Sequence, residues 1–219
     1  NDFRLVEQCW KAINEAGVDR HSYVFVIGGG AVLDLVCFAA STAHRGIRHL
    51  RFPTTTLSQG DGGVGVKNGV NFLGGKNALG TFAPPFAVLN DFDFLRTLPD
   101  RDWLCGVSEA FKVSIIRDRA FFDQLCASAA KYPARDFTAM QVLVKRCAEI
   151  HLEHIRTGGD HGPSGHHCAG GHHCAGPTQV GCDPHDRIVC QLDQGHRQVA
   201  RRTVHQGDRH QGRVPAHAR

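Results

Sequence analysis

The sequence predicts an α/β fold in which a half built from strands and helices is followed by a helical half. A β-rich run at residues 22–27 leads into three consecutive glycines at 28–30 and then into an apolar helix at 31–44. That order is typical of a strand, a tight turn and a helix. From Pro99 onward, apolar residues recur three and four positions apart, which is the spacing of amphipathic helices. The strands are therefore expected to precede the helices.

The other elements follow from local signals of the same kind. Residues 3–13 carry apolar side chains at helical spacing between a capping Asp2 and Gly17, which predicts an opening helix. A second strand is expected at residues 50–52. The glycine-rich stretch at 60–80 fits neither period and is expected to be a long functional loop. In the helical half, helices are expected at residues 103–116, 120–130 and 137–155.

We expect three zones along the chain. Residues 1–98 form a first domain whose N-terminal part is missing, since the chain opens with Asn1 and its single methionine is Met140. Residues 99–160 begin a helical domain. Residues 161–219 form a tail rich in His, Gly, Arg and Cys, a composition that cannot build an ordinary core.

The tail admits two interpretations. It repeats the hexapeptide GHHCAG at 165–170 and 171–176, and imidazole and thiolate groups suit zinc or nickel. The spacing of these groups, however, matches no common zinc motif. Alternatively, residues after about 160 are translated out of frame or are disordered, because the composition changes abruptly there. We favour the second interpretation.

Composition restricts the partners and the location. The net charge of +4 is spread without a dense basic run, which argues against nucleic acid or a membrane surface and favours a small anionic substrate. No apolar run reaches the roughly 18 residues of a membrane span, and no signal-peptide pattern opens the chain. We therefore expect a cytoplasmic protein. The cysteines of the first 160 residues lie mostly in apolar helical patterns and are expected to be buried thiols.

Three groups of residues are candidates for a site. The glycines at 28–30 would let backbone N–H groups approach a diphosphate at a helix N-terminus, although a plain tight turn explains them too. Between residues 45 and 77 lie charged and amide side chains that suit an anionic, polyhydroxylated ligand, or else a solvated loop. Glu109 and Lys112 share a helix face, either as a surface ion pair or as a metal ligand with a substrate-binding lysine.

The order and spacing of several short motifs resemble those of 3-dehydroquinate synthases. The similarity covers about residues 22–157. The motifs are GGGAVLD (28–34), HRG (44–46), PTT (53–55), DGGVGVKNGVN (61–71), GKN (75–77), GTF (80–82) and SEAFK (108–112). The resemblance implies a Rossmann-like NAD-binding domain followed by an α-helical metal-binding domain, here partial.

The resemblance also implies roles for individual residues. It implies that NAD is bound by Gly29, Gly30, Asp34, Thr54, Thr55 and Lys76. The substrate residues implied are Arg45, Asp61, Lys67, Asn77 and Lys112, of which Asp61, Lys67 and Lys112 would be catalytic. Glu109 would be a ligand of a divalent metal, zinc or cobalt, together with two histidines from later in the helical domain.

The activity implied is that of a carbon–oxygen lyase. In this family, NAD transiently oxidises a ring hydroxyl of a sugar phosphate such as a 7-phospho-heptulosonate, phosphate leaves, the hydride returns and an aldol step closes the carbocycle. NAD is recycled in each turnover. We expect a sugar phosphate as the small-molecule partner, no nucleic acid, no membrane, and a homodimer as the assembly.

The chain departs from the family in its substrate loop. The usual serine pair is Gly62 and Gly63, the glycine before Lys67 is Val66, and the threonine after it is Asn68. His151 stands where the synthases carry a further substrate lysine. A strand and helix upstream of residue 1 and a downstream segment with a metal histidine are also missing. These departures predict a divergent homologue with a different sugar phosphate.

Two other functions compete with the cyclase. A metal-dependent polyol or glycerol phosphate dehydrogenase would share the glycine turn, but such enzymes typically carry a lysine where this chain has Ala31 and lack the paired KNGVN and GKN motifs. A catalytically incomplete fragment, or a protein that binds metal through its His and Cys residues, is the third possibility. The motifs favour the cyclase.

Overall fold

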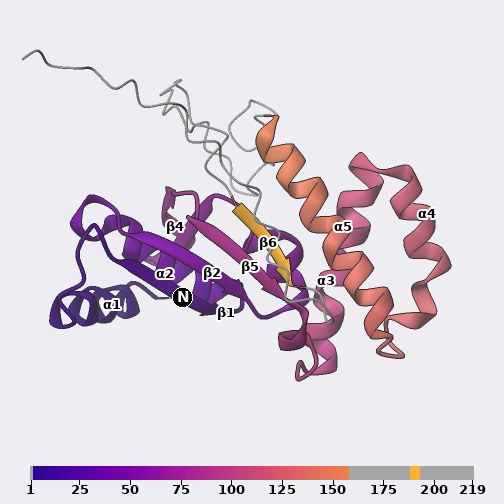
Figure 1. Ribbon diagram of the computed structural model, residues 1–219, viewed down its shortest axis with the longest axis horizontal. Helices are drawn as coiled ribbons and strands as arrows, with labels where there is room; N and C mark the ends of the chain where they lie inside the picture. Colours follow the sequence, from indigo (N-terminus) through magenta and orange to yellow (C-terminus); the bar gives the residue numbers. More distant parts are fainter. Residues whose placement is uncertain (1, 158–187, 193–219) are drawn as a thin grey trace, which may run out of the picture.

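The computed structural model describes residues 2–157 and 188–192, which form two β-sheets and a set of helices (Figure 1). The helices are α1 (Phe3–Glu15), α2 (Gly30–Thr42), α3 (Asp100–Arg117), α4 (Arg119–Ala127) and α5 (Phe137–Arg156). The strands are β1 (Tyr23–Gly28), β2 (Arg48–Pro53), β3 (Lys67–Phe72), β4 (Gly75–Phe82), β5 (Ala87–Asp91) and β6 (Ile188–Leu192). Short helical turns are η1 (Ala43–Arg45), the π-helical η2 (Ser58–Gly62), η3 (Phe92–Leu95) and η4 (Ala129–Lys131).

The main sheet is parallel, with the strand order β1, β2, β5, β6. Strands β1 and β2 are joined by α2 and pair in register from Tyr23 opposite Arg48 to Gly28 opposite Pro53. A parallel pair needs such a crossover, and a helix that packs on the sheet supplies it. Because both strands run the same way, the carboxyl ends of β1 and β2 meet at one edge of the sheet. This edge is where open α/β sheets bind their ligands.

The local patterns of the sequence predict most of these elements to within a few residues. Strands β5 and β6 were not predicted, and the prediction for the stretch at 60–80 was wrong, because the expected loop contains the antiparallel hairpin of β3 and β4. Glycines interrupt the alternation of apolar and polar residues that would have predicted these strands. Gly69 stands opposite Gly80, and a Cβ at Gly80 would lie 2.7 Å from the carbonyl oxygen of Asn68. The strands pair here because both positions lack a side chain.

Among the described residues, buried side chains form several core clusters. One joins α1, α2 and β3 through Val6, Phe38 and Val70. Another lies among α3, α4 and α5 and includes Trp103 and Met140. Figure 1 shows α1 and the three later helices at opposite ends of the molecule, with the sheet between them. The division into domains at residue 98 stays a prediction.

The thiols only partly follow the expectation of burial. Cys37 and Cys147 are buried, Cys9 and Cys105 are partly buried, and Cys126 is exposed. The expectation was wrong for Cys126 because α4 buries Phe121 and Leu125 and turns its opposite face to solvent. Among the described residues, no helix is long and apolar enough to cross a membrane. The hexapeptide repeat of the tail lies outside those residues.

A single threonine fixes α3 to the turn that follows β2. The Thr56 hydroxyl donates toward the carbonyl oxygens of Asp102 (2.9 Å) and Trp103 (3.1 Å), and it accepts the Gly106 N–H at 3.1 Å. A Cβ at Gly106 would lie 2.7 Å from both Cβ and Oγ1 of Thr56. The helix can therefore approach the turn this closely only with glycine at position 106.

We predict that Gly106→Ala destabilises the chain by about 1–3 kcal/mol, the usual cost of forcing extra atoms into a tight contact. This loss should outweigh the gain in helix propensity of up to about 1 kcal/mol. Gly30→Ala is the matched control, since a Cβ at this helical glycine meets nothing within 4 Å. Urea unfolding measures both. A Gly106→Ala variant as stable as the control would contradict the contact.

Candidate functional site

The candidate site begins at the turn between β1 and α2. Gly28 ends the strand and Gly29 is the N-cap of α2, with no side-chain hydrogen bond to the helix end. A Cβ at Gly28 would lie 2.8 Å from the Cβ of Val32, and one at Gly29 would lie 3.1 Å from the Cγ2 of Thr55. The turn is therefore tight, and it leaves the first N–H groups of α2 at the sheet edge, where an anion is favoured.

The threonines after β2 meet this glycine turn. The Thr54 N–H donates to the Gly28 carbonyl at 3.0 Å, and the hydroxyls of Thr55 and Ser58 are hydrogen-bonded at 2.8 Å. The structure thus brings Gly29, Gly30, Thr54 and Thr55 together at the carboxyl edge of β1 and β2. A side-by-side arrangement of this kind suits a dinucleotide, whose diphosphate can lie on the helix end.

Asp34 lies one turn further into α2, close to the centre of the molecule. Burial raises the pKa of this carboxyl to about 6, while the positive charge of Arg51 opposes the shift and the negative charge of Asp61 adds to it. Asp34 is therefore near enough to both groups for their charges to act on it. Helix α2 lies against η2, so the predicted cofactor residues adjoin the predicted substrate loop.

Asp61 sits on the π-helical turn η2, which packs against α5. Its Oδ1 lies 3.1 Å from Nδ1 of His151, and both side chains are largely shielded from solvent. A Cβ at Gly60 would lie 3.1 Å from the Cβ of Cys147, so the turn touches the helix backbone closely. Gln59 secures the other side of η2 by donating to the carbonyl oxygens of Pro53 and Asp91. Single π-helical turns are often found at functional sites.

Glu109 and Lys112 on α3 form an ion pair of 2.5 Å, in which the Glu109 side chain is 17% exposed and that of Lys112 is 52% exposed. The pKa of the Cys147 thiol is raised to about 12, chiefly by burial and to a smaller extent by the negative charges of Glu109 and Asp61. Both carboxylates therefore lie near the same buried thiol. The two side chains form the ion pair that one of the two interpretations expects. The Glu109 carboxylate also lies near Asp61 and Cys147, and we call these residues with His151 the cluster around η2.

The described residues do not form a complete metal site. No group of three or more His, Cys, Asp or Glu side chains in residues 2–157 and 188–192 could hold a metal ion. Glu109 is thus one candidate ligand without companions in this part of the chain. The histidines of the tail lie outside it.

The hairpin carries three of the predicted residues. Lys67 opens β3 opposite Phe82, and Lys76 and Asn77 lie in the first part of β4. Asn77 lies beside β3, because a Cβ at Gly69, two residues after Lys67, would lie 3.2 Å from the Cβ of Asn77. The hairpin therefore keeps Asn77 close to the strand that carries Lys67.

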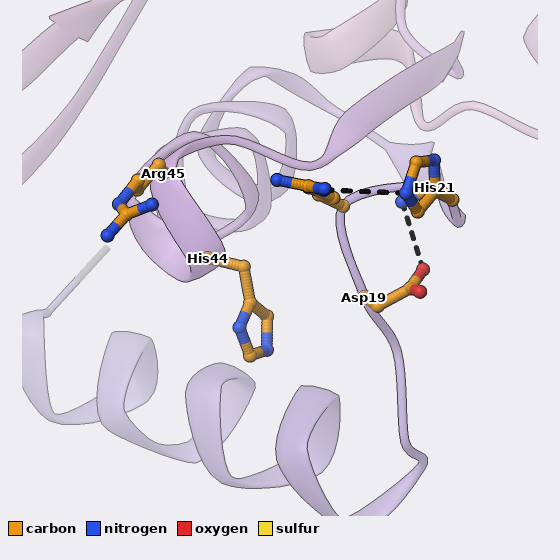
Figure 2. A pocket seen from close by; sticks show the side chains of 5 residues that line it. Asp19, His21, His44 and Arg45 are labelled. Carbon is orange, nitrogen blue, oxygen red and sulfur yellow. Dashed lines mark hydrogen bonds between the residues drawn. The ribbon is translucent and has the colours of Figure 1, made fainter.

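Arg45 lies at the far end of α2 from the glycine turn, about 20 Å away for a helix of this length. It follows His44, and both residues have positive φ, 49° and 66°. With the loop that contains Asp19 and His21 they line an open hollow of about 570 Å³ (Figure 2). This hollow is at the opposite edge of the sheet, so Arg45 is not part of the cluster around η2.

Sequence reasoning missed one residue of the site entirely, Arg51. Its side chain is 1% exposed and points from β2 into the loop after η2. The signal was a charged residue that alternates with Leu50 and Phe52 in a strand leading to a glycine-rich loop. An arginine at such a position must be buried on one face of the sheet or exposed on the other, and local pattern alone cannot decide between them.

Comparison with known proteins agrees with this geometry. The fold and the glycine turn define a nucleotide-binding type of α/β protein. Residues 1–105 match the family described as 3-dehydroquinate synthase N-terminal. Through these residues, the chain belongs to the 3-dehydroquinate synthase family.

Two curated relatives carry that name. The 3-dehydroquinate synthase of Rhodopirellula baltica is 41% identical over 144 residues, which are 66% of this chain and 38% of the relative. The one from Streptomyces coelicolor is 39% identical over 155 residues, 69% of this chain and 43% of the relative. The chain thus spans about two fifths of the length of these relatives.

Solved structures confirm the predicted α/β fold. A 2-epi-5-epi-valiolone synthase from Streptomyces hygroscopicus, solved with NAD⁺ and Zn²⁺ bound, is 34% identical, with a TM-score of 0.68 over 71% of this chain and 44% of its own. A 2-deoxy-scyllo-inosose synthase complexed with carbaglucose-6-phosphate, NAD⁺ and Co²⁺ has a TM-score of 0.59 at 24% identity, over 68% of this chain and 40% of its own. The second likeness shows the fold alone.

We predict that Asp34 makes the free energy of unfolding depend on pH between about 4 and 6. Its pKa is raised from 3.8 to about 6 in the folded chain. The stability gained from the protonated carboxyl is therefore complete below pH 3.8 and is lost as the pH rises through 6. In Asp34→Asn this loss is absent, because the amide does not titrate.

Urea unfolding of both proteins at a series of pH values between about 3.5 and 7.5 measures the effect. His49, whose pKa burial lowers from 6.5 to about 4, acts in the opposite direction but is common to both proteins. Their difference in unfolding free energy should shift in favour of Asp34→Asn as the pH rises. A difference that stays constant with pH would contradict the burial of this charge.

Proposed function

We propose that this chain is part of an NAD-dependent sugar phosphate cyclase of the 3-dehydroquinate synthase type, a lyase that releases phosphate. One observation carries the proposal. The turn after β2 touches the glycine turn through Thr55 and touches the helical half through Asp61, which pairs with His151. A single short segment thus joins the predicted cofactor residues to the predicted substrate residues.

NAD is the cofactor that the glycine turn supports. The space over Gly29 is one that a side chain would crowd against Thr55, and the first turn of α2 has no side-chain cap. Gly29, Gly30, Thr54 and Thr55 would hold the dinucleotide, with Asp34 beside them and Lys76 as a further predicted contact. The chemistry that NAD supplies when bound is reversible hydride transfer with a ring carbon of the substrate.

The substrate side combines an anion-binding and a hydroxyl-binding part. The exposed ammonium groups of Lys67 and Lys112 suit the phosphate of a sugar phosphate such as a 7-phospho-heptulosonate. Asp61, whose Oδ1 lies 3.1 Å from Nδ1 of His151, can accept hydrogen bonds from ring hydroxyls. Arg45 and Asn77 stay predicted substrate residues; Asn77 lies beside the strand that carries Lys67, whereas Arg45 lies at the far end of α2.

The proposed enzyme uses a divalent metal, zinc or cobalt, but the described residues do not form a complete site for it. Those residues supply one candidate ligand, Glu109, and its carboxylate is paired with Lys112. They do not fit a metal ion by themselves, and we assign no reaction step to one. The Zn²⁺ and Co²⁺ named with the two solved synthases support the choice of metal.

The dehydrogenase alternative is less well supported. A probable glycerol dehydrogenase from Sinorhizobium meliloti shares the fold with a TM-score of 0.53, but at 16% identity this likeness shows the fold alone. Relatives at 39% and 41% identity are synthases. A catalytically incomplete fragment, a homodimer and a cytoplasmic location all stay open to test.

We predict that, in a full-length synthase with a carboxylate at the position of Glu109 and a lysine at that of Lys112, changing the carboxylate to glutamine removes bound zinc and phosphate release together. The loss of a metal-ligand carboxylate should cost both. In the same protein, the lysine aligned with Lys112 changed to methionine should keep its zinc and raise KM for the sugar phosphate about tenfold or more, since a charged hydrogen bond to phosphate is lost.

Zinc content by metal analysis and phosphate release measure the two effects separately. A surface ion pair contributes only about 0–1 kcal/mol, so breaking it would leave both quantities nearly unchanged. Full zinc and near-normal turnover in the glutamine variant would therefore refute the role proposed for Glu109.

A further inference from the structure

Arg51 is hydrogen-bonded to the loop after η2 through both of its terminal nitrogens. Its Nη1 donates to the carbonyl oxygens of Gly63 (3.1 Å) and Gly65 (2.6 Å), and its Nη2 donates to the side-chain oxygen of Asn68. Its Nε points at the sulfur of Cys37 at 3.3 Å. A guanidinium group with five N–H donors is thus bonded to three oxygens that all belong to residues 63–68.

The hydrogen bonds of Arg51 are important because its positive charge is buried. A cation removed from water is unfavourable unless oxygens replace its hydration. No ion pair of Arg51 is found among the described residues, and the carboxylate of Asp34 acts on it only as a nearby charge. The loop oxygens therefore replace water around Arg51, and these hydrogen bonds are lost when the loop moves away from β2.

Asn68 extends the contact into the rest of the molecule. It is 4% exposed, and its amide nitrogen donates to the hydroxyl of Thr81 at 3.3 Å. Thr81 in turn is hydrogen-bonded to the hydroxyl of Ser41 at the end of α2, at 2.9 Å. Asn68 is one of the residues at which the chain departs from the synthases, which carry threonine there.

Gly63 shows how closely the loop approaches β2. A Cβ at this position would lie 2.4 Å from the Cγ of Pro53 and 2.6 Å from the carbonyl oxygen of Ser58. Its φ of −74° is one that any residue adopts, so only space requires the glycine. At Gly62, by contrast, a Cβ would meet nothing within 4 Å. Of the two glycines that replace the usual serines, Gly63 alone is required by packing.

We propose that Arg51 is a positioning residue that clamps the substrate loop, residues 60–67, against β2. Through the carbonyl groups of Gly63 and Gly65 it fixes where the loop presents Asp61 and Lys67. The Asn68 side chain accepts one of the Arg51 hydrogen bonds, and the lack of a side chain at Gly63 leaves room for the loop beside Pro53. That this loop binds substrate rests on the proposed function, whereas the hydrogen bonds between Arg51 and the loop do not.

Hydrogen exchange of the chain tests the clamp without any ligand. In Arg51→Met, which keeps the length of the side chain and removes its charge, the amides of residues 63–65 should exchange at least about tenfold faster. Those of α4, which has no contact with Arg51, should not change. The single ammonium group of Arg51→Lys cannot replace the two guanidinium nitrogens that bind the loop. In this variant, the amides of residues 63–65 should therefore exchange at an intermediate rate. An unchanged loop, or an equal acceleration in α4, would overturn the proposal.

The two glycines provide a matched pair for the same measurement. Gly63→Ser should speed exchange in the loop as Arg51→Met does, because the added atoms push the loop away from Pro53. Gly62→Ser adds the same atoms in open space and should behave as the unaltered chain. If both variants behave alike, the close approach at Gly63 is not what holds the loop.

Calorimetry then connects the clamp with function, with NAD and glucose 6-phosphate as probes. Arg51→Met should weaken the affinity for glucose 6-phosphate about tenfold or more while changing that for NAD less than about threefold. Equal losses for both ligands would contradict a role confined to the loop. If the unaltered chain binds neither probe, the proposed function fails, and the exchange data still decide for or against the clamp.

Discussion

The turn between β2 and η2 is the constraint on which the rest of the structure depends. Thr56 is inserted into the hydrogen bonds of α3, where it contacts the backbone of Asp102, Trp103 and Gly106. Four residues later, Gly60 lies against Cys147 of α5. This short segment contacts the glycine turn at Thr55 and contacts α3 and α5 at Thr56 and Gly60. It therefore fixes the distance between the strand-containing half and the helical half. Glycine at 60 and 106 is what permits this closeness.

Charge is distributed around the turn in a way that follows from burial. The cation of Arg51 is buried and satisfied by loop oxygens, while His49, two residues earlier on the same strand face, has its pKa lowered to about 4 by burial and by that cation. His49 is therefore neutral at neutral pH. The carboxylates of Asp34, Asp61 and Glu109 lie on the surrounding elements α2, η2 and α3. Asp61 faces His151, and Glu109 faces Lys112.

Local sequence patterns predicted the fold well and the site unevenly. Periodicity predicted β1, α2 and the helices of the second half, because each signal lies within one element. It missed the hairpin, where glycine pairs hide the alternation, and it missed Arg51, whose burial depends on the loop that covers it. Asp61 and His151 are 90 positions apart, and no local pattern can pair them. The resemblance to the synthases suggested a role for both positions, but not that the two side chains touch.

The account is tested most directly by asking whether the two halves unfold as one. The chain has two tryptophans, Trp10 in α1 and Trp103 in α3, so fluorotryptophan labelling gives one ¹⁹F resonance for each half. If the turn couples the halves, both folded resonances should disappear at the same urea concentration. In Thr56→Val, which removes the hydroxyl from α3, the Trp103 resonance should disappear first. Separate transitions in the unaltered chain, or coincident ones in Thr56→Val, would contradict the coupling.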